Sequence, residues 1–199
     1  MFIEEAKPSP ERQALYDEDT NDVGYVMNLS RAWGWVPAIN DGLFDLLDQA
    51  ALAGDLSFRD KGILITAMAS GMEDSYCSLA WGTRLAEATD PETAVAVIVG
   101  QASNALTVRD LALAAWARKV AAAPNTTTQA DVDELRIAGL SDQQIMAVTA
   151  FVALRIAFST VNDAIGTPPD RETAEAAPPQ VVSAIRFGRP TDQSPSTGR

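Results

Sequence analysis

The residues best able to do chemistry gather in one short segment, residues 73–82, which reads EDSYCSLAWG. It holds Cys77, the only cysteine of a chain that contains no histidine. On a helix, residues four apart lie on the same side, so Glu73, Cys77 and Trp81 are predicted to form one stripe, with Asp74 and Arg84 beside it. A thiol, two acids and an aromatic ring on one face are the parts of a cysteine-based or an acid–base site.

The charges around Cys77 argue against a reactive thiol. A nucleophilic cysteine needs a histidine, a cation or a helix N-terminus that lowers its pKa. Here Glu73 and Asp74 come one turn earlier and disfavour the thiolate, and Arg84 offsets them only in part. We therefore expect Cys77 to be a poor nucleophile, and a small buried residue is the plainer interpretation. Glu73 is the preferred acid–base candidate if it lies in an apolar pocket against Trp81; otherwise it is a helix-start acid.

Size and composition narrow the class of protein. The chain has 199 residues, 47% of them apolar, and a formal charge of -12. That charge argues against nucleic acid and anionic membranes as partners. A lone cysteine without histidine argues against a zinc or iron site, so no metal and no cofactor are expected. The N-terminus lacks the order of a signal peptide, and the most apolar segment, residues 145–161, is short and interrupted by Arg155. We expect a cytoplasmic protein.

Helical periodicity and caps run through the sequence. Helices are expected over residues 22–31, 38–53, 57–71, 72–88, 91–99, 107–122, 128–135 and 142–164. The prediction is an all-α protein: a single domain of seven or eight helices over residues 21–166, after an N-terminal extension, residues 1–20. Residues 167–199 form a tail with six of the eleven prolines. Its apolar stretch, residues 181–187, is expected to clasp its own domain or a neighbouring subunit, or to dock on a separate partner.

One five-residue pattern occurs twice. Residues 56–60 read LSFRD and residues 106–110 read LTVRD, fifty positions later. Each has the form of a helix cap followed by an arginine and an aspartate. The repeat is interpreted either as the trace of a duplicated helical unit or as chance, since caps recur in any helical protein.

Four stretches carry a resemblance to a known family. They read WGWVP (33–37), LSFRDKGIL (56–64), YCSLAW (76–81) and DVDELRIAGLSDQQI (131–145). Their order and spacing, over residues 25–165, resemble the alkylhydroperoxidase D and carboxymuconolactone decarboxylase superfamily, especially its peroxidase-related branch. The resemblance implies an alkylhydroperoxidase D-like helical fold and a homo-oligomer, a dimer, trimer or hexamer.

The sequence departs from that family at its redox motif. The family's redox members use C-x-x-C-x-x-x-H and an upstream glutamate. Aligned on Cys77, the first cysteine becomes Asp74, the histidine becomes Trp81 and the glutamate becomes Gly62. Without a second thiol no intramolecular disulfide can form in turnover, so the dithiol peroxidase mechanism is not possible here.

Three functions stay open. The first choice is an enzyme of the lyase, decarboxylase or isomerase kind that acts on a small molecule by non-redox acid–base chemistry. The alternatives are a one-cysteine peroxidase-like enzyme and an inactive oligomeric binding or scaffold protein. The candidate catalytic residues are Glu73, Cys77, Asp74 and Tyr76, and the candidate substrate-binding residues are Trp81, Trp33, Trp35, Arg84 and Arg155. Arg155 is expected to pair with a carboxylate from another helix or to hold a substrate carboxylate.

Overall fold

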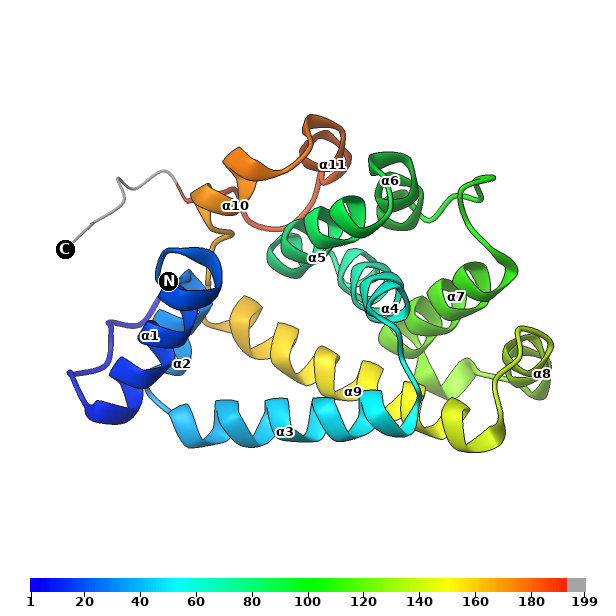
Figure 1. The fold of residues 1–199 in the computed structure, drawn as a ribbon, viewed down its shortest axis with the longest axis horizontal. Coiled ribbons are helices and arrows are strands. Elements are labelled where there is room, and N and C mark those ends of the chain that lie inside the picture. Colours follow the sequence, from blue (N-terminus) through cyan, green and yellow to red (C-terminus); the bar gives the residue numbers. More distant parts are fainter. Residues whose placement is uncertain (193–199) are drawn as a thin grey trace.

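The computed structural model describes residues 1–192, and its regular structure is helical throughout (Figure 1). Those residues contain no strand. The elements are, in chain order, α1 (Pro10–Val23), α2 (Asn28–Trp33), α3 (Pro37–Ala53), α4 (Phe58–Gly71), α5 (Ser75–Ala88), α6 (Pro91–Val99), α7 (Val108–Ala122), the 3₁₀ turn η1 (Pro124–Thr126), α8 (Gln129–Ile137), α9 (Asp142–Ala164), α10 (Arg171–Ala176) and α11 (Pro179–Ala184). The all-α prediction is confirmed. The described part has more than the expected seven or eight helices because α1, α10 and α11 lie in the segments that were predicted as terminal extensions.

The helix starts follow the caps that the sequence predicts. Ser57, Thr107 and Ser141 begin α4, α7 and α9 as capping boxes, in which the side chains of the cap and of the residue three positions later each bond the other's backbone. Asp90 caps α6 through a 2.8 Å bond from the Thr93 N–H. These caps satisfy backbone donors that the first turn of a helix leaves open.

Helix α9 is the long central element. It runs beside α3 on one side and meets α4 and α7 on the other (Figure 1). With 23 residues and a mean hydropathy of 1.7 it is long and apolar enough to cross a membrane by those two criteria alone. The argument that this segment is too short to span a bilayer is therefore wrong. Its packing accounts for the apolar character instead, because Val148, Val152 and Phe158 are at most 2% exposed.

The two copies of the repeated pattern lie against each other. The Arg59 guanidinium donates to Asp110 at 2.7 Å, and the Arg109 guanidinium donates to Asp60 at 2.8 Å. Each aspartate is at the same time the N3 residue of its own capping box. The starts of α4 and α7 are thus joined by two reciprocal ion pairs.

Both terminal segments pack on the helical domain. Residues 10–23 form α1, which Gly24 ends in a left-handed conformation (φ +86°), and α2 begins only at Asn28, so the single helix predicted over residues 22–31 is wrong in its first half and correct in its second. In the tail, Pro179 occupies the first turn of α11, where a proline needs no hydrogen bond. Val181 is fully buried, and α11 contacts α5 and α6. The described part of the tail therefore clasps its own domain; residues 193–199 lie outside the described residues.

Candidate active site

Helix α5 begins at Ser75, later than predicted, and this changes which acid lies near the thiol. Asp74 is the N-cap and accepts a 3.0 Å bond from the Cys77 N–H. Glu73 lies in the turn before the helix, in the left-handed region (φ +60°), and is exposed. Glu73 therefore does not share a helical stripe with Cys77 and Trp81, and that prediction is wrong. The acid at the site is Asp74, which is fully buried.

Cys77 is 2% exposed and faces two polar side chains of α9. The Ser159 hydroxyl donates to its sulfur at 3.3 Å, and Nη2 of Arg155 lies 4.0 Å from the same sulfur. Burial raises the pKa of the Cys77 thiol far above its ordinary value, and the Asp74 charge raises it further. Arg155 and Ser159 oppose this shift only in part. The thiol therefore carries its proton at neutral pH.

Arg155 is a buried cation that forms no ion pair within residues 1–192, although the charge of Asp74 acts on it through space. It is 5% exposed. The rings of Phe158 and Trp81 lie 5.1 and 5.5 Å from its guanidinium carbon, and its Nε has no hydrogen-bond acceptor among the described residues. The predicted pairing with a carboxylate from another helix is wrong. Burial lowers the pKa of the Arg155 guanidinium.

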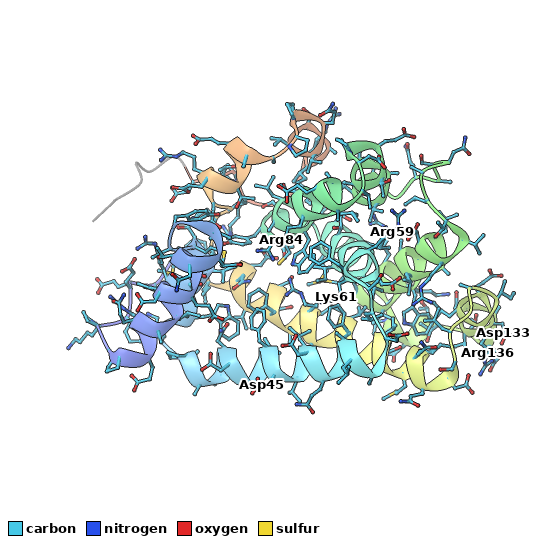
Figure 2. The ribbon with its side chains drawn as sticks, viewed as in Figure 1. Asp45, Arg59, Lys61, Arg84, Asp133 and Arg136 are labelled. Atoms are coloured by element: carbon cyan, nitrogen blue, oxygen red, sulfur yellow. The ribbon has the colours of Figure 1, made fainter. Side chains whose placement is uncertain are left out.

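Trp81 is half-buried and packs on Arg155. Its ring lies 5.9 Å from that of Phe58 on α4 and 5.4 Å from the guanidinium carbon of Arg84. Arg84 lies on the side of α5 that is turned toward α9 (Figure 2). Its ion pair with Asp22 is long, 3.9 Å, and exposed to solvent. Trp81 and Arg84 of α5 thus lie close to Arg155 of α9. The two segments are about 70 residues apart in the chain, and no sequence pattern predicts this contact.

Tyr76 points away from the thiol. Its hydroxyl donates a hydrogen bond to Asp170, which also accepts a 2.7 Å bond from the Asn28 N–H. Burial raises the pKa of Asp170 to about 6. These contacts join α5 to α2 and to the start of α10, so the structure gives Tyr76 a role in holding the tail and places it outside the site.

The tryptophans predicted to bind substrate divide into two groups. Trp33 is buried, stacks on Phe158 at 5.3 Å and donates to Asn162 at 2.8 Å, so it supports the ring that packs on Arg155. Trp35 is 52% exposed and bonds the Glu4 carbonyl, so it lies outside the cluster.

Sequence reasoning missed three residues of α9 in this cluster. Ser159, Phe158 and Asn162 are at most 2% exposed, and Ser159 contacts the thiol directly. The spacing of Arg155 and Ser159, four residues apart, places both on one helix face and could have indicated the second once the first was chosen. Within residues 1–192 no three acidic or cysteine side chains gather into a metal-binding group.

Comparison with protein-family models gives no match, and comparison with curated proteins gives none either. Solved structures do match. An uncharacterized peroxidase-related protein from Ralstonia eutropha JMP134, described as an alkylhydroperoxidase AhpD core, has a TM-score of 0.71 and 22% identity, over 95% of this chain and 100% of that one. A peroxidase-related protein from Silicibacter sp. TM1040 has a TM-score of 0.73 and 20% identity, over 84% and 89%.

A protein with a stated activity has a similar structure. The debrominase Bmp8 in its apo form has a TM-score of 0.74 and 14% identity, over 94% of this chain and 98% of that one. A cysteine-to-alanine variant of that debrominase, in complex with 2,3,4-tribromopyrrole, matches with a TM-score of 0.71. At such identities the likeness establishes the fold and leaves the reaction open. The chain has the alkylhydroperoxidase D-like fold of the peroxidase-related proteins, as the order of its sequence motifs predicts.

Proposed function

We propose that this chain is an enzyme that moves a proton on a small organic molecule, with Asp74 and Cys77 as its acid–base pair. The observation that carries the proposal is the buried cluster of Asp74, Cys77, Arg155 and Ser159. Oδ2 of Asp74 and Nε of Arg155 are buried without a hydrogen-bond partner in the described residues. Buried polar groups are normally satisfied, and exceptions concentrate where a protein binds or reacts.

Each residue of the cluster suits one part of a proton transfer. Asp74 takes a proton from a carbon next to a carbonyl group, and the protonated Cys77 thiol delivers a proton elsewhere on the same molecule. The proton on Asp74 then returns to the sulfur, which restores both groups. Arg155 and Ser159 supply donors that stabilise the negative charge formed between the two steps.

The test is hydrogen–deuterium exchange in D₂O, followed by NMR, on a panel of small ketones, keto acids and unsaturated lactones. We expect the protein to exchange a carbon-bound proton of at least one compound. Asp74→Asn, which keeps a good N-cap, and Cys77→Ala should each slow that exchange by roughly 10²-fold or more. Glu73→Gln, one residue earlier and exposed, is the matched control and should exchange at the wild-type rate.

Two outcomes contradict the proposal. Exchange by no compound of the panel would favour the binding or scaffold alternative. Thiol-dependent consumption of hydrogen peroxide that disappears in Cys77→Ala would establish the one-cysteine peroxidase alternative instead.

We also propose that the chain forms a homo-oligomer through the outer face of α9. Between residues 143 and 162 the only charged residue is Arg155, which is buried. The exposed side of that helix is a stripe of apolar and small residues: Met146, Ala150, Ala153, Ala157 and Val161. Copies with a charge of -12 repel one another wherever acidic faces meet, so an uncharged apolar face is where a second copy can pack.

Light scattering at micromolar concentration should give a mass of at least two chains of 21.2 kDa each. Ala153→Glu places a charge in the middle of the stripe and should yield monomers. Ala130→Glu, an exposed alanine on α8, is the matched control and should leave the mass unchanged. A wild-type mass of 21.2 kDa would refute the proposal.

A further inference from the structure

Two guanidinium groups lie near one tryptophan ring at the solvent side of the site. Arg155 and Arg84 have their guanidinium carbons 5.5 and 5.4 Å from the Trp81 ring. In a chain with 27 acidic and 15 basic residues, two arginines close to each other and both poorly paired are unexpected. The two like charges repel each other, and Asp74, whose charge acts on Arg155, forms no ion pair with it, so a further anion beside the two arginines would lower their repulsion.

Neither guanidinium forms a close ion pair with a carboxylate of the described residues. Arg155, 5% exposed, meets two ring faces and a thiol, and its Nε lacks an acceptor among the described residues. Arg84 has the 3.9 Å ion pair with Asp22, whose side chain is 72% exposed, and such pairs contribute little. Both cations therefore retain donors for a further oxygen ligand. By contrast Arg118, another largely buried arginine, donates to the backbone carbonyls of Val97 and Ile98.

We propose, resting on the proposed function, that the substrate is an organic carboxylate with a flat conjugated body, and that Arg155 and Arg84 bind its carboxylate while Trp81 stacks on its body. Planar guanidiniums match carboxylates with two parallel bonds, and indole faces favour flat partners. Since Nη2 of Arg155 is 4.0 Å from the Cys77 sulfur, a carboxylate on Arg155 brings the adjoining carbon to the thiol. Trp81, half-buried over Arg155, is then the side chain that turns aside to admit the substrate.

Cys77, as the only cysteine, reports on this site through two alkylating agents of similar size. Iodoacetate is an anion and iodoacetamide is neutral. Their rates on the folded protein, measured by mass spectrometry, are compared with those on the urea-unfolded chain, so that the thiolate fraction cancels from the ratio. We expect folding to raise the ratio of iodoacetate to iodoacetamide by roughly tenfold, about the worth of one charge-assisted contact. Arg155→Met and Arg84→Met should each lower it toward the unfolded value, and Arg118→Met, the matched control, should leave it raised.

A second measurement tests the flat body. Benzoate should protect Cys77 from iodoacetamide at lower concentrations than cyclohexanecarboxylate does, and Trp81→Leu should abolish that difference. The carboxylate proposal is overturned if folding leaves the ratio of iodoacetate to iodoacetamide rates unchanged, or if Arg155→Met raises it as much as the wild type does. Equal protection by benzoate and cyclohexanecarboxylate also overturns it. Labelling of Cys77 needs no turnover, so carboxylate binding can be confirmed even if the exchange experiment contradicts the proposed proton transfer. Failure of one proposal can therefore be told from failure of the other.

Discussion

Asp110→Ala should lower the free energy of unfolding by about 3 kcal/mol, the sum of a lost helix cap and of lost charge-assisted bonds. Asp110 is 2% exposed and accepts bonds from the Thr107 N–H, the Thr107 hydroxyl and the Arg59 guanidinium. Burial raises the pKa of Asp110, but the bonds from Arg59 and Thr107 outweigh it and lower the pKa overall. The carboxylate is thus more favourable in the folded protein than in the unfolded chain, and its contribution is present above about pH 4 and lost below.

Urea unfolding at pH 7 measures this loss of stability. A matched control shows how much stability is lost when an exposed aspartate is removed instead. Asp133 on α8 pairs with Arg136 at 2.7 Å, but both side chains are largely exposed (Figure 2). Asp133→Ala should cost no more than about 0.5 kcal/mol. A loss below about 1 kcal/mol for Asp110→Ala would mean that the crossed pairs at the starts of α4 and α7 contribute no more than ordinary surface bridges.

The same residues show why the fold could be predicted. A capping box is a local pattern of four residues, so Ser57–Asp60 and Thr107–Asp110 mark helix starts without knowledge of the rest of the chain. The crossed pairing of Arg59 with Asp110 depends on how two helices meet, and the sequence carries it only as a repeat at a spacing of fifty residues. The repeat pointed to a related pair of elements and left their contact open.

The site was harder to predict, for two physical reasons. Periodicity gives the faces of a helix but not the residue at which it begins, and a turn with a left-handed Glu73 moved the start of α5 to Ser75. The second reason is distance along the chain. Arg155 and Ser159 reach Cys77 from α9, about eighty residues away, and no local pattern predicts that contact or that Arg155 forms no ion pair within residues 1–192.

The second large effect concerns the reactivity of Cys77. Native protein at pH 7.5 should react with iodoacetamide at least about 100-fold more slowly than the urea-unfolded chain, because burial and Asp74 both raise the thiol pKa. In the unfolded chain the labelling rate should level off once the pH exceeds the ordinary thiol pKa of about 8.5. The native rate should still rise about tenfold per pH unit through pH 9, since the thiolate fraction grows tenfold per unit below the pKa.

Variants separate the causes of this low reactivity. Asp74→Asn removes the nearby negative charge and should speed labelling, whereas Arg155→Met removes the opposing positive charge and should slow it. A native profile that levels off with an apparent pKa below about 7 would contradict the prediction and favour a one-cysteine peroxidase. Burial itself is the largest cause of the shift, so the thiol should stay slow even in Asp74→Asn. Such a thiol is a weak acid and gives its proton only to a stronger base, such as the carbanion that forms when Asp74 removes a proton from carbon, and this is the role that the proposed function gives to Cys77.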